Sequence, residues 1–166
     1  MSARLLLDDF DGTLGRLELR PECCGTRAFF HVQYWDKAEK PVEAVLTFSD
    51  VIAVSFSVNY FDNPIGGELF GLYEIENEAE KAELLRENFR SRRREFLLAG
   101  YDGYDPEDPH DILNYTGEME RFIKLTEGYH LYQQQTQGGT YRLLAGGFKV
   151  EEVRHGPVGP GTGTVG

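Results

Sequence analysis

The sequence predicts an α+β fold, with a mainly antiparallel sheet or sandwich of about seven strands and one long helix. Consecutive segments between Thr13 and Phe61 are rich in β-branched and aromatic residues with partial alternation, which is typical of strands that pair with their neighbours. Only one later stretch has a clear helical period. The chain has 166 residues, of which 40% are hydrophobic and 13% aromatic, so we expect a single domain over residues 1–154.

The first half of the chain contains most of the expected strands. Leu5–Asp8 is short and apolar, and Asp11-Gly12 is a dipeptide typical of hairpin turns, so we expect a hairpin that continues into Leu14–Arg20. Turn-forming residues at 36–41 and 62–67 separate the later strands. These later strands are expected at residues 28–34, 42–49, 51–61 and 68–76.

The helix is expected from about Glu78 to Ala99. Asn77 followed by Glu80 resembles a capping box, and Gly100 is a natural stop. Apolar residues of the helix and of the strands are expected to form much of the core. They are Phe29, Val32, Leu46, Phe48, Val54, Phe56, Val58, Leu72, Leu85, Phe89 and Phe96.

The second half ends in a further hairpin and a tail. Residues 129–135 and 140–144 are separated by Gly138-Gly139, and residues 148–153 are expected to extend this hairpin. Residues 155–166 are rich in glycine and proline without periodicity, which indicates a flexible tail.

Composition excludes several functional classes. The formal net charge of −11 argues against nucleic-acid binding, which needs a basic surface, and it suits a basic protein partner. No apolar run has the roughly 20 residues of a membrane span, so we expect no membrane association and a cytoplasmic location. Cys23 and Cys24 are adjacent and lack the spacing of a metal or redox site, which indicates free thiols.

One motif points to a reaction. Asp9-Phe10-Asp11-Gly12-Thr13-Leu14 matches the D-x-D-G-T-L stretch of haloacid-dehalogenase-like phosphatases, in which an aspartate attacks phosphorus beside Mg²⁺. That fold requires a crossover helix after the first strand, whereas residues 15–34 have a strand pattern and a turn. We therefore expect Asp11-Gly12 to be a turn, and the phosphatase is the alternative function. No catalytic residue and no cofactor are predicted.

An acid-rich loop is the predicted binding site. Its carboxylates lack the spacing of a calcium loop, so no metal is predicted, and a solvated loop or a contact with a basic partner remains. The arginine-rich end of the helix is expected to complement the helix dipole, and the four scattered histidines form no ligand pair. The predicted partner-binding residues are Tyr101, Asp102, Tyr104, Asp105, Glu107, Asp108 and Asp111.

The order of several segments resembles small acidic immunity proteins of bacterial toxin systems. The segments are Val45–Val51, the helix, the Glu127-Gly128 turn, Tyr129–Tyr132 and Phe148–Val153. The resemblance implies a protein that binds and blocks a cognate toxin and has no chemistry of its own. Together with the negative charge, it favours a non-catalytic protein-binding module.

Overall fold

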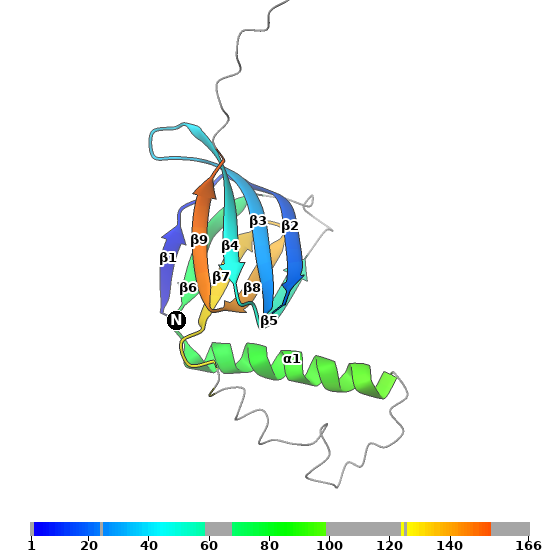
Figure 1. The fold of residues 1–166 in the computed structure, drawn as a ribbon. Helices are drawn as coiled ribbons and strands as arrows, with labels where there is room; N and C mark the ends of the chain where they lie inside the picture. The colour runs from blue at the N-terminus through cyan, green and yellow to red at the C-terminus, as the bar shows by residue number, and fades with distance from the viewer. Residues whose placement is uncertain (1, 24, 59–67, 99–123, 125, 154–166) are drawn as a thin grey trace, which may run out of the picture.

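Two antiparallel sheets face each other, and one helix lies across their lower end (Figure 1). The computed structural model describes residues 2–23, 25–58, 68–98, 124 and 126–153. The front sheet has the order β2 (Thr13–Glu22), β3 (Gly25–Trp35), β4 (Pro41–Ser49) and β9 (Gly147–Glu152). The back sheet has the order β1 (Ala3–Leu7), β6 (Leu69–Ile75), β7 (His130–Thr136), β8 (Gly139–Ala145) and β5 (Ala53–Val58).

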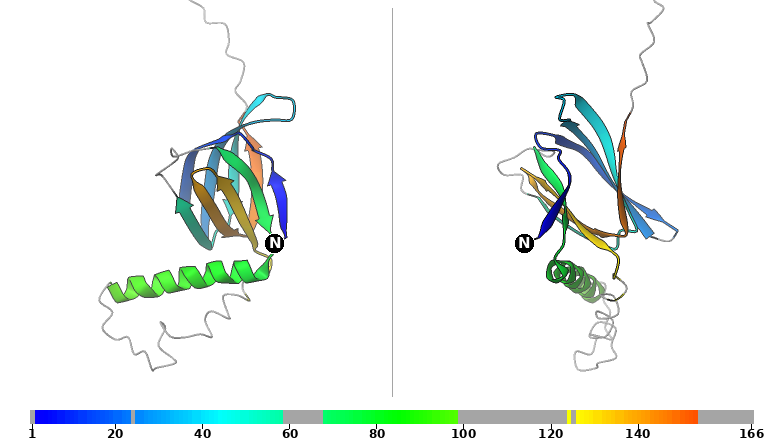
Figure 2. Two further views of the ribbon diagram at one scale, coloured as in Figure 1. Left: turned by 180° about the vertical axis from the view of Figure 1, so that it is seen from behind. Right: turned by 90° about the vertical axis from the view of Figure 1, so that its left-hand side faces the viewer.

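The predicted class is confirmed in its main lines. Every described pair of named strands is antiparallel, and α1 (Glu78–Leu98) is the one helix of the described part of the chain that has several turns. The described residues contain nine strands in two sheets, where about seven were expected. Figure 2 shows the two sheets in profile, with β1 and β9 on neighbouring edges.

The β2–β3–β4 meander was predicted correctly, because its strands pair with their neighbours in the chain. Leu17 lies opposite Phe30, and Phe30 lies opposite Leu46. Side chains alternate along a strand, so Phe30 and Val32 are buried while Phe29 lies on the outer face. The Arg20 guanidinium is 4.6 Å from the centroid of the Phe29 ring. The prediction that Phe29 belongs to the core was therefore wrong.

Two predicted connections were wrong because neighbouring strands belong to different sheets. β1 and β2 do not form a hairpin; β1 pairs with β6, and the chain then crosses to the front sheet. Likewise β9 does not extend the β7–β8 hairpin but pairs with β4. Both crossings belong to the sandwich architecture. A strand that leaves one sheet joins the other, and the two sheets cover each other's inner faces.

The core fills the space between the sheets. Among the predicted core residues, Val32, Leu46, Phe48, Leu72 and Leu85 are buried. The side chains of Val54 and Phe56 are partly buried against the same core. Val58, in contrast, is 36% exposed and lies at the end of β5, so the prediction that it belongs to the core was wrong. The side chains of the predicted core residues Phe89 and Phe96 lie outside the described part of the structure.

The helix begins as the capping box predicts. Asn77 Oδ1 accepts the Ala79 N–H at 3.0 Å, and Asn77 Nδ2 donates to Glu80 Oε1 at 3.0 Å. Leu84 and Leu85 form a second apolar cluster with residues of the back sheet. Within the described ranges, no helix combines the length and apolarity that crossing a bilayer requires. Cys23 is a free, exposed thiol, and Cys24 lies outside the described residues.

Candidate functional site

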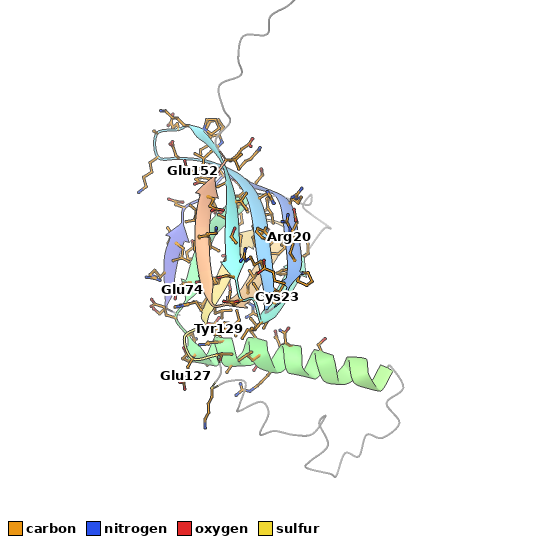
Figure 3. All side chains as sticks on the ribbon, in the orientation of Figure 1. Arg20, Cys23, Glu74, Glu127, Tyr129 and Glu152 are labelled. Atoms are coloured by element: carbon orange, nitrogen blue, oxygen red, sulfur yellow. The ribbon has the colours of Figure 1, made fainter. Side chains whose placement is uncertain are left out.

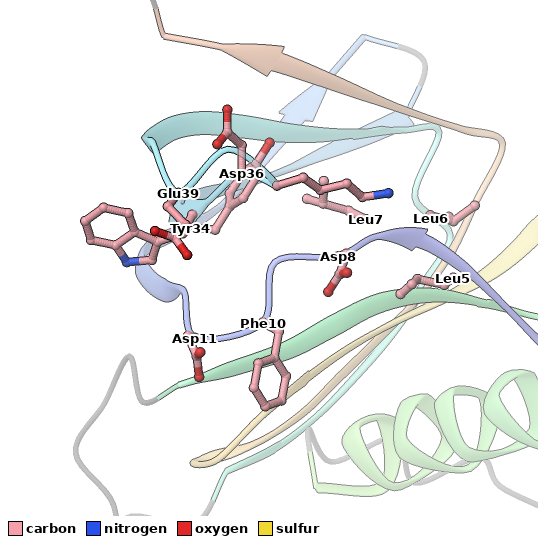
Figure 4. A pocket seen from close by; sticks show the side chains of 11 residues that line it. Leu5, Leu6, Leu7, Asp8, Phe10, Asp11, Tyr34, Asp36 and Glu39 are labelled. Carbon is pink, nitrogen blue, oxygen red and sulfur yellow. The ribbon is translucent and has the colours of Figure 1, made fainter.

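A cleft of about 970 Å³ opens beside the β3–β4 hairpin (Figure 4), which lies at the end of the sandwich away from the helix (Figure 1). It lies between β1 with the β1–β2 turn on one side and the β3–β4 hairpin on the other (Figure 4). Apolar, aromatic and acidic side chains share its lining. The lining residues are Leu5, Leu6, Leu7, Asp8, Phe10, Asp11, Tyr34, Trp35, Asp36, Lys37 and Glu39.

The D-x-D-G motif forms the turn that carries the chain from the back sheet to the front sheet. The Gly12 N–H donates to the Asp9 carbonyl at 2.9 Å, and Asp11 adopts a left-handed φ of 62°. A Cβ atom on Gly12 would lie 2.5 Å from the Gln33 carbonyl oxygen, so only glycine fits. The predicted turn is confirmed, although it joins two sheets.

Asp9 is fully buried below this turn, with an exposed fraction of 0%. Gln134 Nε2 donates to Asp9 Oδ1 at 3.3 Å and to the Gly71 carbonyl at 3.1 Å. Burial raises the pKa of Asp9 to about 6, although hydrogen bonds from Gln134 and from backbone N–H groups partly offset this effect. The side chain therefore joins the β1–β2 turn to β7 and is not among the residues that line the cleft.

Two acceptor atoms in this buried pair lack a hydrogen-bond partner among the described residues. They are Asp9 Oδ2 and Gln134 Oε1. A protonated Asp9 could donate from its hydroxyl group, whereas an ionised Asp9 offers only acceptors. The pair is therefore better satisfied with a proton on Asp9, in line with the raised pKa of this carboxyl group.

Asp11 and Glu68 form a second carboxyl pair at the turn. A side-chain hydrogen bond with Asp11 raises the pKa of Glu68, because two neighbouring carboxylates favour a shared proton. The backbone of the same segment is held by the Leu69 N–H, which donates to the Gly12 carbonyl at 2.9 Å. Acidic groups are thus concentrated beside the cleft at the start of β6.

Exposed aromatic side chains stand at the rim of the cleft. Phe10 has 54% of its surface exposed and Trp35 has 56%. The Phe10 ring lies 5.9 Å from the Phe70 ring, which holds it beside β6. Large exposed aromatic rings next to charged groups are typical of protein-binding surfaces.

Charges on the β3–β4 hairpin add to the acidic character of the cleft. Asp36 Oδ1 accepts the N–H groups of Ala38 at 2.8 Å and Lys40 at 2.9 Å, so this carboxylate organises the turn. Glu39 is exposed at the tip of the hairpin and Asp8 is exposed on the opposite wall. Lys37 is the one cationic side chain in the lining, against four carboxylates.

The predicted binding loop falls outside the part of the chain that the structure describes. The residues concerned are Tyr101, Asp102, Tyr104, Asp105, Glu107, Asp108 and Asp111.

The cleft was not predicted from the sequence, since Phe10 and Trp35 were not singled out there. A useful signal was present, because the single tryptophan of the chain stands directly before the polar turn at Asp36. In the described residues, no group of three or more His, Cys, Asp or Glu side chains could hold a metal ion.

The geometry around Asp9 differs from that of the phosphatase alternative. β1 is an edge strand in an antiparallel sheet, and residues 15–20 lie within β2, where the phosphatase fold would place a crossover helix. A nucleophilic aspartate must also face its substrate, whereas the Asp9 carboxylate is buried against Gln134. These observations favour a structural role for Asp9.

In comparisons with known proteins, no protein-family model, no curated protein and no solved structure matches the chain.

Proposed function

We propose that this chain is a non-catalytic module that binds a basic protein partner, in the manner of an immunity protein that neutralises a bacterial toxin. The observation that carries the proposal is the acidic, aromatic-rimmed cleft between β1 and the β3–β4 hairpin. Carboxylates there attract a cationic surface, and exposed rings supply the apolar contact area that protein interfaces concentrate in a few residues.

The net charge of the whole chain also favours a basic protein as the partner. A net charge of −11 steers a basic protein toward this surface and raises the rate of encounter. In this proposal the predicted loop residues Asp102, Asp105 and Asp108 add to the steering field. Reversing these three residues to lysine should slow association and weaken its dependence on salt.

The test is a comparison of two charge-reversal variants as bait for affinity capture from a cell lysate with mass spectrometry. One variant carries Asp8→Lys and Glu39→Lys on the two walls of the cleft. The matched control carries Glu127→Lys and Glu151→Lys, which change the net charge equally. Glu127 lies at the helix end of the molecule (Figure 3), and neither control residue lines the cleft.

We expect a basic protein that the wild type and the control retain and that the cleft variant loses. The captured protein is then purified, and its association rate is measured against ionic strength. A partner held equally by both variants would place the interface elsewhere on the molecule. Capture of no basic protein at all would contradict the proposed function.

A further inference from the structure

In the part of the chain that the structure describes, no strand pairs with the outer edge of β1, which lies beside the cleft. Among the described strands, β1 pairs with β6 only, and it occupies the end of the back sheet. Its sequence is Ala-Arg-Leu-Leu-Leu, with 48% of the Leu5 surface exposed. Proteins commonly protect such edges with charges or proline. Here the one charged residue, Arg4, is engaged in an ion pair with Glu74.

The hydrogen-bond pattern identifies which backbone groups point outward. The Glu76 N–H donates to the Ser2 carbonyl at 3.0 Å, and Arg4 lies opposite Glu74. Hydrogen-bonded and non-hydrogen-bonded pairs alternate in an antiparallel ladder, so Arg4 is bonded to β6. The N–H and C=O groups of Ala3 and Leu5 therefore point away from β6.

The cleft continues from this edge. Leu5 and Leu7 of β1 line it together with Asp8, which follows the strand directly (Figure 4). A segment that paired with Leu5 would thus run between β1 and the carboxylates of Asp36 and Glu39 on the β3–β4 hairpin. An extended segment projects alternate side chains to one side, so its cationic groups could meet these acids every second residue.

Resting on the proposed function, we infer that the basic partner contributes an extended segment that adds to the outer edge of β1 and places a lysine or arginine side chain in the cleft. The backbone bonds to Ala3 and Leu5 would give affinity, and the acidic cleft would give selectivity for a cation. The rings of Phe10 and Trp35 would flank that side chain and favour it through cation–π contact.

The probe is a synthetic heptapeptide that alternates valine and lysine, compared with the same peptide carrying glutamate for lysine. Trp35 is the single tryptophan of the chain, so its emission reports directly on the rim of the cleft. We expect the Trp35 emission to change as the lysine peptide is added until binding saturates. The glutamate peptide should leave the emission unchanged. Hydrogen exchange at the Leu5 amide should slow when the lysine peptide is bound.

Two substitutions at Leu5 separate edge pairing from attraction by charge. Leu5→Pro removes an N–H that points away from β6, so the bonds within the sheet are kept, and Leu5→Ala is the control that retains this N–H. We expect Leu5→Pro to bind the lysine peptide at least about tenfold more weakly than Leu5→Ala. Circular dichroism is measured first, and both variants must show the wild-type spectrum. A lysine peptide N-methylated at alternate residues tests the same bonds on unaltered protein, and it should not bind.

Each contrary result has a distinct meaning. Equal binding of the lysine peptide to both Leu5 variants, or full binding of the N-methylated peptide, overturns edge pairing but leaves a basic partner in place. Binding of the glutamate peptide overturns the selectivity for a cation. Trp35 emission that stays constant with peptide overturns the inference. A Trp35 signal that changes with protein concentration, together with a dimer in sedimentation, would assign the β1 edge to a second copy of this chain. That result also overturns the inference.

Discussion

Replacing Asp9 with asparagine should stabilise the protein above pH 6 and leave its stability unchanged in acid. The buried carboxyl has a pKa raised to about 6 from an ordinary value of 3.8. A tenfold change in a proton-binding constant corresponds to about 1.36 kcal/mol, so the ionised form costs the folded state about 3 kcal/mol. Asparagine carries no charge, and its amide group can donate to the Gln134 Oε1 atom that lacks a partner.

The sign of the pH dependence follows from the raised pKa of Asp9. Below pH 3.8, Asp9 is protonated in both the folded and the unfolded chain, so wild type and Asp9→Asn should be equally stable. Between pH 3.8 and about 6 only the unfolded chain loses the proton, and the wild type loses stability as pH rises. Above about 6 the difference between the two proteins should stay constant at its maximum.

The assay is urea unfolding of both proteins across this pH range. The difference in free energy of unfolding isolates Asp9, because all other carboxyl groups are common to the two proteins. A stabilisation of about 1–3 kcal/mol at neutral pH that vanishes in acid would agree with the reasoning. A difference that does not vary with pH, or an Asp9→Asn protein that is less stable at neutral pH, would refute it.

Three further predictions concern the turn at Gly12, the helix cap at Asn77 and the D-x-D-G motif. Gly12→Ala should cost about 3 kcal/mol, because the new Cβ meets backbone at 2.5 Å, whereas Gly15→Ala, whose nearest contact is 3.8 Å, should change the melting temperature little. Asn77→Ala should cost about 1 kcal/mol in urea unfolding through loss of the helix cap, and Glu127→Ala serves as its exposed control. Wild-type protein with Mg²⁺ and a panel of phosphate monoesters should release no phosphate that depends on Asp9, and release abolished by Asp9→Asn would identify a phosphatase.

Local patterns predicted the elements of this fold well. The cap at Asn77, the turn after Asp36 and the β7–β8 hairpin depend on residues close together in sequence, and all are present. The strand pattern of β3 was also recognised. Its inward face was assigned incorrectly at one position, because Phe29 and Phe30 are equally apolar and only pairing with β2 and β4 decides which ring is buried.

The assignment of strands to sheets and the site could not be predicted in the same way. Nothing near Asp11-Gly12 distinguishes a hairpin turn from a crossing between sheets, since the turn residues are the same. The partner of Asp9 is Gln134, which is 125 residues away in the chain. Likewise the cleft combines Leu5, Asp8 and Glu39, which become neighbours only when β1 and the β3–β4 hairpin meet at one end of the sandwich.

The order of strands along the chain sets the order in which the two sheets can form during synthesis. The β2–β3–β4 meander is complete once Ser49 has been synthesised. In contrast, Ala53 of β5 cannot pair until Leu144 of β8 has been synthesised. Until the back sheet arrives, the rings of Phe30 and Phe48 face solvent on the nascent meander. Pairing over such long separations is slow, and an uncovered apolar face invites aggregation. We therefore expect slower translation between β5 and β8 to lower the yield of folded protein.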